Sequence, residues 1–305
     1  MTQYLHSPLE CNNYRLYNPL PFSHSRYFRI KRNQLLFRFK NNSPYISGDS
    51  IAALCDYVAF GRNKLDRLDF KRIRAAKSIF VPGEKFIDFL QLAGEHITAH
   101  TLATGNSDQN FLEPVELPPS VSLWLCQNNA ISNLEQVRTL PIGIENLRLG
   151  RSGLPKYFRS HRETAQVNRV LVPPMSPTNP IRLPSIFEAM KRPDVFEVRQ
   201  TLLVEKEYFS MTRDFRFVLC CEGNGFENHR IWETLYQGSF PVMFNSPWSN
   251  SLRYLQLPIM YIDSLDEINA KFLKDFLDQH LEFRPEEIET LWIPYWRKVI
   301  QQGHL

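Results

Sequence analysis

A glycine-rich stretch with closely spaced charges offers the clearest chemistry in the sequence. Residues 220–244, CCEGNGFENHRIWETLYQGSFPVMF, predict a strand, a loop at residues 223–225, a helix over residues 227–237 and a second strand. Glycines let the backbone approach a ligand closely, and the N-terminus of a helix favours negative charge. Arg230 and Glu233 are three residues apart, so they share a helical face. A cation near the helix start suits a diphosphate and a carboxylate one turn later suits a ribose diol, so the stretch predicts a nucleoside-diphosphate site.

A plainer interpretation of this stretch stays open. It could be a tight turn between two strands, with Arg230 and Glu233 forming a surface ion pair. A Walker loop is excluded because no Gly-Lys-Ser/Thr follows the glycines. The dinucleotide-binding fingerprint is excluded because its third glycine is missing from the required offset.

The elements expected around this stretch are strands that alternate with helices. Residues 77–83, 96–105 and 121–127 predict strands, and residues 84–94 predict a helix with one apolar face. A second strand–helix series begins at residue 169. This alternation is typical of parallel sheets covered by helices, so we expect an α/β fold.

The chain is expected to form two Rossmann-like lobes that face each other across a cleft. Its 305 residues are enough for two domains of ordinary size. Glycine, proline and charge interrupt the pattern at residues 151–168, which is the best candidate for a linker. We predict an N-terminal Rossmann-like lobe over residues 1–154, a C-terminal lobe over 155–285 and a helical tail over 286–305. Pro294 is expected to interrupt or kink the tail helix.

Basic residues concentrate in the first half of the chain, although the net charge of +4 is small. Residues 26–40 hold six basic residues and no acidic one, and residues 62–77 hold seven against two. Such clusters suit a polyanion, a phosphorylated ligand or an anionic membrane surface. The alternative is solvated faces interleaved with core residues. We expect peripheral contact with an anionic membrane. We expect no nucleic-acid partner, because the two basic stretches are the only feature of the sequence that would favour one.

Cysteine usage favours a reducing compartment. The five cysteines are odd in number and lack paired metal-ligand spacing. Cys220 and Cys221 are adjacent in a predicted strand, so they point to opposite faces and make a poor disulfide. No apolar window reaches the ~18 residues needed to span a bilayer. We therefore expect reduced thiols and a cytoplasmic location.

Residues 222–244 resemble the nucleotide-sugar motif of two-lobed (GT-B) glycosyltransferases of the exostosin-like type. That pattern is Arg/Glu-Gly-x-Gly, an acidic or polar residue, Arg, x-Glu-Ala-Leu, x-x-Gly and then Pro-Val. Here Thr234 stands where Ala is usual, and Glu227 stands in a position often held by Asp. ISGDS, LATGNSD, WLCQNN and LPIGIENL more loosely resemble N-terminal lobes of polysaccharide glycosyltransferases. Together these resemblances cover most of residues 44–266.

The resemblance implies transfer of a sugar from a nucleoside-diphosphate sugar to a hydroxyl of a glycan or oligosaccharide, with UDP favoured over GDP. It implies that Arg230 binds the diphosphate and Glu233 the ribose. Further residues that it implies at the donor are Asn179, Arg182, Gly223, Asn224, Gly225 and His229. No two Asp residues are two positions apart, so the Asp-x-Asp motif of metal-dependent transferases is absent. We expect a metal-independent transfer without a cofactor.

We expect an inverting transfer, which needs a carboxylate or histidine to take the acceptor proton. Asp49 in ISGDS and Asp108 in TGNSD both follow predicted strands, which puts them at the edge of the cleft. Asp49 is the first candidate and Asp108 the second, although either could be a cap or turn residue. Asn128 follows another strand and could touch the sugar or close a turn.

The remaining notable residues are interpreted as structural. His96 and His100 are predicted to share one face of a strand as partly buried residues, and Trp124 and Trp232 to lie in the core. A catalytically silent glycan- or nucleotide-binding relative with the same fold is the alternative function, favoured if both candidate aspartates pointed away from the cleft. A Rossmann oxidoreductase is disfavoured by the missing fingerprint.

Overall fold

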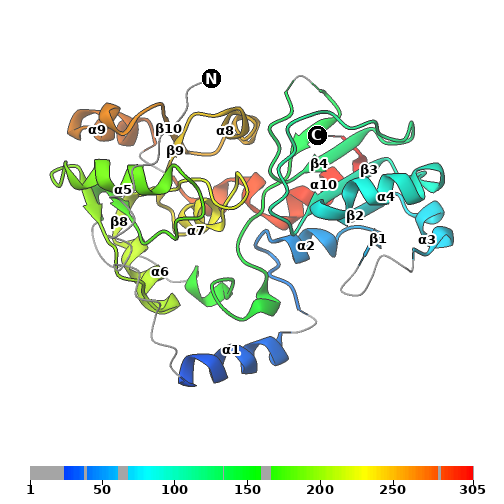
Figure 1. Ribbon diagram of the computed structural model, residues 1–305, viewed down its shortest axis with the longest axis horizontal. Coiled ribbons are helices and arrows are strands. Elements are labelled where there is room, and N and C mark those ends of the chain that lie inside the picture. The colour runs from blue at the N-terminus through cyan, green and yellow to red at the C-terminus, as the bar shows by residue number, and fades with distance from the viewer. Residues whose placement is uncertain are drawn as a thin grey trace, which may run out of the picture.

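The computed structural model describes residues 24–37, 40–60, 68–132, 134–158, 166–280 and 283–304. Cys11 and parts of the basic stretch at 62–77 and of the linker at 151–168 lie outside these residues. Two five-stranded sheets occupy the two halves of the molecule (Figure 1). All of their strand pairings are parallel, which confirms the predicted α/β class.

The first sheet and its helices form the first lobe. The strand order is β1-β2-β3-β4-β5, with bounds β1 (Tyr57–Val58), β2 (Ser78–Pro82), β3 (Thr101–Gly105), β4 (Leu123–Cys126) and β5 (Val137–Thr139). Its helices are α2 (Gly48–Ala52), α3 (Phe70–Ala75) and α4 (Phe86–Ala93). Every residue of β3 and β4 is buried, as expected for central parallel strands that are covered on both faces.

The second sheet forms the second lobe, with strand order β10-β9-β8-β6-β7. Its strands are β6 (Val167–Val172), β7 (Phe196–Val198), β8 (Phe215–Leu219), β9 (Phe240–Phe244) and β10 (Met260–Ile262). Its helices are α5 (Arg182–Met190), α6 (Glu205–Arg213), α7 (His229–Tyr236), α8 (Pro247–Asn250) and α9 (Ala270–Gln279). Two further helices, α1 (His24–Leu36) and α10 (Ile293–Gln302), precede the first sheet and follow the second sheet in the chain. This arrangement is compatible with the two Rossmann-like lobes that we expected.

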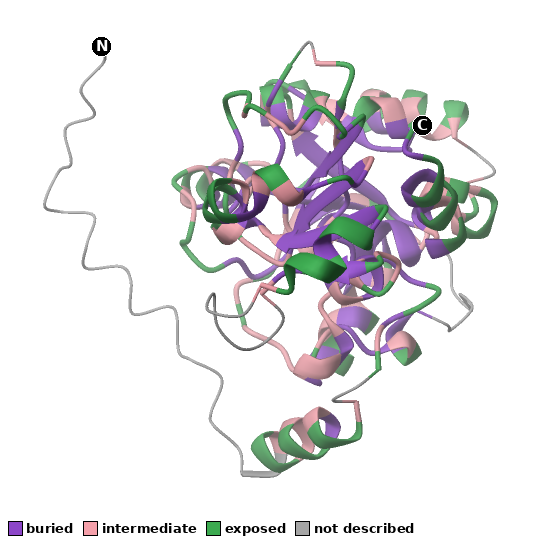
Figure 2. Ribbon diagram, turned by 90° about the vertical axis from the view of Figure 1, so that its right-hand side faces the viewer, coloured by how far each residue is buried: buried purple, intermediate pink, exposed green. Residues whose placement is uncertain are grey.

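One hydrophobic core is shared by both lobes. It includes Phe80 from the first sheet, Val218 from the second sheet and Trp232 from α7. Two further clusters are each confined to one lobe, and Trp124 belongs to that of the first lobe. Figure 2 shows the strands as the most deeply buried elements. Both tryptophans are fully buried, which confirms that they are core residues.

The tail returns to the first lobe. Pro294 lies in the first turn of α10, where its missing N–H costs no helical hydrogen bond. The helical stretch is interrupted near Pro294 as predicted, because 3-10 turns at Pro285–Glu287 and Glu289–Leu291 precede α10, but Pro294 begins α10 and does not kink it. Thr101 Oγ1 donates to the carbonyl of Ile300 (3.2 Å), and Ser122 Oγ donates to that of Gly303 (3.0 Å). These bonds fasten α10 to the strands of the first sheet.

The two histidines do not share a strand, so that prediction is wrong. His96 ends a 3-10 helix (Gly94–His96), and His100 lies one residue before β3. The chain continues from α4 into this tight turn, which delays the strand to Thr101. Both histidines are half-buried and hydrogen-bonded, His96 with Arg74 (2.9 Å) and His100 with Thr101 (2.8 Å), in keeping with structural roles.

Among the described residues Cys55, Cys126, Cys220 and Cys221 are free thiols. Cys220 and Cys221 point into different hydrophobic clusters, so they do face opposite sides. Within the described ranges, no helix combines the length and apolar character required to cross a membrane.

Candidate active site between the lobes

A cavity of ≈ 410 Å³ lies between the lobes where several strands end. Most of its lining comes from loops after β2 and β3 and from residues 142–149, and His229 at the start of α7 closes it from the second lobe. Its polar lining residues are Glu84, Asn106, Ser107, Asp108, Asn146, Arg148 and His229. Open parallel sheets bind ligands at the carboxyl ends of their strands, so this cavity is the candidate site.

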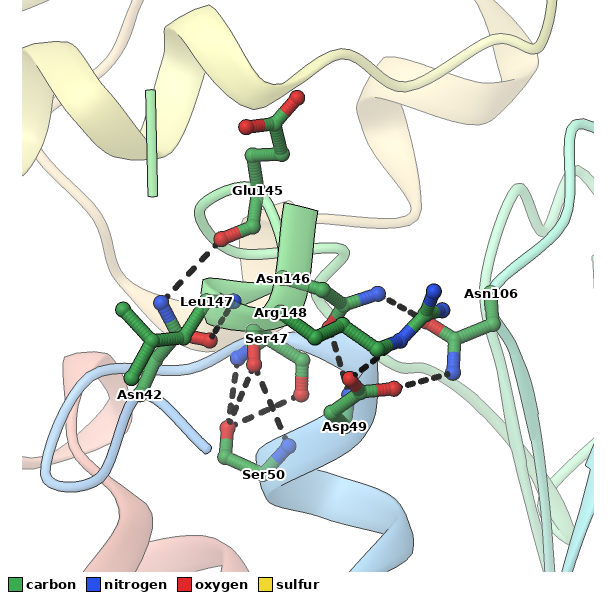
Figure 3. Close-up of polar contacts among 9 residues, drawn as sticks. All are labelled: Asn42, Ser47, Asp49, Ser50, Asn106, Glu145, Asn146, Leu147 and Arg148. Carbon is green, nitrogen blue, oxygen red and sulfur yellow. Dashed lines mark hydrogen bonds and ion pairs between the residues drawn. The ribbon is translucent and has the colours of Figure 1, made fainter. Parts of the chain in front are cut away.

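Asp49 lies in a closed polar network behind the cavity wall (Figure 3). Its Oδ2 accepts from Arg148 Nε (2.6 Å) and its Oδ1 accepts from Asn106 Nδ2 (3.2 Å). Its backbone N–H donates to Asn146 Oδ1 (2.7 Å), and Asn146 Nδ2 donates to Asn106 Oδ1 (2.7 Å). A Cβ on Gly48 would lie 1.8 Å from Asn106 Oδ1, so this close approach requires glycine. Both oxygens of the Asp49 carboxylate are thus already bonded.

Local capping fixes the backbone around this network. Ser47 is the N-cap of α2, and its Oγ accepts from the Ser50 N–H (3.2 Å) while Ser50 Oγ accepts from the Ser47 N–H (2.7 Å). Buried Asn42 holds the facing loop, because it accepts from the Leu147 N–H (2.9 Å) and donates to the carbonyl of Glu145 (3.1 Å). Figure 3 shows the carboxylate of Glu145 pointing away from Asp49.

Asp108 reaches across the cavity to the second lobe. Its side chain is exposed, and its Oδ2 accepts from Asn224 Nδ2 (3.2 Å) in the glycine loop. Next to this contact, the Phe226 N–H donates to Asn110 Oδ1 (2.9 Å). The loops that follow β3 and β8 therefore touch, although they are more than a hundred residues apart in the chain.

Asn128 ties the same two loops together. Its Oδ1 accepts from the Glu227 N–H (2.8 Å) and its Nδ2 donates to the carbonyl of Ser107 (3.1 Å). A Cβ on Gly225 would lie 2.8 Å from Asn128 Nδ2, so Gly225 allows the asparagine to approach the loop. Of the two roles considered for Asn128, the structure shows the one that closes the loop.

His229 lines the cavity from the second lobe. Its Nδ1 lies 2.8 Å from the carbonyl of Gly143, and because a carbonyl can only accept, Nδ1 must carry the proton. Burial lowers the pKa of His229, which favours the neutral ring and leaves Nε2 as an acceptor. Asn228, the N-cap of α7, makes no side-chain cap bond within the described chain. The first N–H groups of α7 thus remain available to an anion.

Arg230 is directed into the second lobe. Its Nε donates to Tyr208 Oη (3.0 Å) and its Nη2 donates to the carbonyl of Pro174 (2.9 Å), just beyond the end of β6. Among the described residues it makes no ion pair with Glu233. The alternative of a surface ion pair between these two side chains is therefore wrong, because the guanidinium turns towards α6.

Glu233 is buried, with 6% of its surface exposed. The resemblance implies that Glu233 binds the ribose, but its carboxylate does not lie open in the cleft, and α7 contacts residues 143–145 through the His229–Gly143 hydrogen bond. Burial raises the pKa of Glu233 to about 8, with Glu145 adding to the rise and Arg230 opposing it. Its carboxylate accepts no hydrogen bond within the described part of the chain. Glu233 is thus poised to be neutral near pH 7.

Arg182 and Asn179 support the glycine loop from below. Arg182 is buried, and it donates through Nε to the carbonyl of Glu222 (2.6 Å) and through Nη1 to that of Ser176 (2.9 Å). Asn179 Nδ2 donates to the carbonyl of Gly223 (3.2 Å). A Cβ on Gly223 would lie 3.1 Å from Arg182 Nη2. Both side chains hold the loop in place through its carbonyl groups.

Glu227 joins the two lobes and was not singled out as a site residue. Its Oε1 accepts from the Ile142 N–H (2.8 Å) in the first lobe and from Trp232 Nε1 (2.6 Å) in the second. Its Oε2 has no hydrogen-bond partner among the described residues. Burial raises the pKa of Glu227 to about 8. The resemblance to the Asp position of the motif was the signal that could have drawn attention to it.

The predicted residues therefore fall into two groups. Asp108 and His229 line the cavity, and Asn224 of the glycine loop contacts Asp108. Asp49, Arg182, Arg230 and Glu233 do not line it and occupy bonded or buried positions. Arg148 was missed, because its partner Asp49 is 99 residues away and nothing in the local sequence connects them.

No three His, Cys, Asp or Glu side chains of the described residues gather in a group that could hold a metal ion. No protein-family model matches the sequence, and no curated protein matches it either.

Proposed function

We propose that this protein is a glycosyltransferase that moves a sugar from a nucleoside-diphosphate sugar to a hydroxyl of a glycan acceptor. One observation supports this above others: the glycine loop after β8 meets Asp108 of the opposite lobe beside a cavity at strand ends. A donor held by the loop would present its sugar to that carboxylate. The GT-B arrangement, the UDP-sugar donor and the inverting outcome belong to this proposal.

In this proposal the donor diphosphate lies at the start of α7. The first N–H groups of the helix and the nearby cation of Arg230 favour a dianionic group there. Arg230 has N–H groups beyond those that bind Tyr208 and Pro174, and these would contact phosphate. Glu233 would accept the ribose hydroxyls. Because it is buried beside Glu145, donor binding would have to part the seam between α7 and residues 143–145.

Asp108 is the base that we favour. Asp49 has both carboxylate oxygens bonded, whereas Asp108 is exposed and accepts one long bond from Asn224. Asp108 can therefore exchange that partner for an acceptor hydroxyl without breaking an ion pair. In this view Asp49 is a positioning residue that orients Arg148 towards the cavity.

The test is a thermal-shift panel of UDP, GDP, CMP, ADP and NAD on the full chain. A ligand that binds only the folded state raises the melting temperature, and we expect UDP to give the largest shift. Glu233→Gln should reduce this shift, whereas Glu188→Gln on α5, where the side chain is 40% exposed and pairs with Lys191, should leave it unchanged. A shift with NAD alone would favour an oxidoreductase instead. No shift with any nucleotide would contradict the proposal.

Measurements of sugar transfer test two further points: whether the protein is a catalytically silent binding protein, and whether transfer needs a metal ion. UDP binding without transfer of any sugar tested would favour a catalytically silent binding protein. If transfer occurs, we expect it to survive EDTA, and loss of activity that manganese restores would contradict metal independence. The cytoplasmic location remains a proposal that is supported by the free thiols of Cys126 and Cys220.

A further inference from the structure

α1 is attached to the rest of the molecule through polar side chains. Arg26 and Arg29 both pair with buried Glu205 of α6, at 3.0 Å and 2.6 Å. Asn33 Nδ2 donates to the carbonyl of Gly150 (3.2 Å), and Gln34 Nε2 donates to that of Leu149 (3.4 Å). The helix lies at the margin of the molecule, below both lobes (Figure 1).

The opposite side of α1 exposes large apolar residues. Phe28 is 65% exposed and Leu35 is 75% exposed, and Tyr27 and Leu36 flank them with 42% and 57%. Phe28 and Leu35 are seven residues apart and so lie on one helical face. This is the reverse of an ordinary surface helix, which turns its apolar side inward. Figure 2 shows most of α1 exposed or half-buried.

Cations share this outer face. Lys31 and Arg32 are three and four residues after Phe28, so they lie between Phe28 and Leu35 on the helix surface, and both are exposed. Lys31 Nζ lies 5.6 Å from the ring centre of Tyr27. An apolar strip with basic flanks is the pattern of helices that lie in the headgroup region of a bilayer.

A basic cavity adjoins α1. It has a volume of ≈ 430 Å³ and lies between α1, α6 and the 3-10 helix at residues 155–157. Its charged lining residues are Arg29, Lys156, Lys206 and Arg213, with no acidic residue among them. Arg29 is already paired with Glu205, so Lys156, Lys206 and Arg213 are the cations that suit a phosphate group in this cavity.

We propose that α1 and this cavity dock the protein on an anionic lipid bilayer, with Phe28 and Leu35 entering the interface and the cavity accepting a lipid phosphate. Charge decides between the possible occupants. A second copy meeting the same face would place Lys31 and Arg32 against their own counterparts, which repel. An anionic bilayer offers both the apolar layer and the opposite charge. The proposal goes beyond the transfer reaction and does not depend on it.

The first experiment is sedimentation of the full chain with vesicles. We expect binding to an equal mixture of phosphatidylcholine and phosphatidylserine and little binding to phosphatidylcholine alone. Phe28→Ser with Leu35→Ser should lower the partition coefficient about tenfold or more. The matched control is Leu112→Ser with Phe187→Ser, which removes two exposed apolar residues outside α1 and should bind as the wild type does. Equal binding to both vesicles, or an equal loss in the control, would overturn the proposal.

The second experiment tests charge. Lys31→Gln with Arg32→Gln should weaken anionic binding about tenfold or more, and Lys156→Gln with Lys206→Gln should weaken it further. Lys271→Gln with Lys274→Gln on α9 is the control of equal charge change. Competition by soluble glycerol phosphate at the cavity should be partial, because it lacks the apolar contact. Complete competition would mean that the cavity binds a free phosphate compound, and a dimer that Phe28→Ser dissociates would mean that a second copy covers α1; either result would overturn the proposal.

Discussion

Asp49 and Asp108, the two candidate bases predicted from the sequence, are held in opposite ways. Asp49 is bonded to Arg148 and Asn106, and its backbone to Asn146. Asp108 is exposed and has one contact with Asn224, across the gap between the lobes. A bonded group in a network resists change, whereas an exposed group with one weak partner can exchange it. We infer from this difference that Asp49 holds the residues of the cavity wall in position, whereas Asp108 is free to contact a substrate.

The largest effect is expected for Asp108→Asn. Loss of a general base lowers turnover by about 10²- to 10⁴-fold, and the melting temperature should hardly change because the side chain is exposed. Asp263→Asn is the matched control, since Asp263 is also exposed at the end of a strand and accepts from an asparagine amide, that of Asn245 (2.7 Å). Sugar-transfer rates with the donor identified by thermal shift provide the measurement. If Asp49→Asn loses about 10²- to 10⁴-fold of turnover at unchanged stability while Asp108→Asn stays active, then Asp49 is the base and Asp108 is not.

Arg230→Lys should reduce turnover by roughly 10- to 150-fold, because a guanidinium can hold two phosphate oxygens and an ammonium cannot. Charge grows on the diphosphate as the glycosidic bond breaks, so the effect should appear in kcat. The control is Arg192→Lys, since Arg192 also donates to carbonyl groups of the second lobe, those of Leu265 and Ile268. Wild-type turnover in the Arg230 variant would show that Arg230 does not bind the diphosphate and has only a structural role, through its hydrogen bonds to Tyr208 and Pro174.

Asp49→Asn should cost about 1–2 kcal/mol of unfolding free energy, between the values for exposed ion pairs and for charged hydrogen bonds. The pair is partly exposed, with 21% for Asp49 and 32% for Arg148, which limits the effect. Urea unfolding of Asp49→Asn, Arg148→Met and the double variant measures the coupling. Additive losses in the double variant would show that the two side chains act independently and that the network is not a unit.

Buried Glu227 should make stability depend on pH. Burial raises the pKa of Glu227 from 4.5, its ordinary value, to about 8 in the folded protein. The unfolded chain therefore loses this proton first as pH rises. The contribution of Glu227 to the free energy of unfolding is therefore at its maximum below about pH 4.5. It decreases as pH rises towards 8, by at most about 1.4 kcal/mol per pH unit for one proton. Glu227→Gln should remove the contribution of Glu227 to this slope and leave that of Glu233, whose pKa is also raised to about 8, as measured by urea unfolding between about pH 5.5 and 7.5. Exposed Glu286→Gln should retain the whole slope, and an unchanged slope in the Glu227 variant would mean that this carboxyl ionises freely.

The local parts of this structure were open to prediction from the sequence. Buried parallel strands such as β3 and β4 are short apolar runs, and Gly223 and Gly225 mark the loop after β8, so the α/β class and the loop followed from neighbouring residues. Boundaries were less accurate, since the turn after α4 moved His96 out of the predicted strand.

The contacts that decide the use of each side chain were not open to prediction. Asp49 had its partner Arg148 far along the chain, and Arg230 turned towards Tyr208 because α6 packs beside α7. Burial of Glu233 depends on residues 143–145 of the other lobe. Motif spacing specifies which residues share a helical face, whereas tertiary packing specifies what that face meets.

The return of α10 to the first lobe bears on how the chain folds during synthesis. Thr101 and Ser122 belong to the first half of the chain, yet their partners Ile300 and Gly303 are translated after the whole second lobe. On the order of a hundred residues, at about 5–20 residues per second, take roughly 5–20 seconds to translate, and for that time this edge of the nascent first lobe stays uncovered. Buried Trp296 and Ile300 then close the gap. A nascent first lobe is thus a natural client for a chaperone that binds exposed apolar surface near the ribosome.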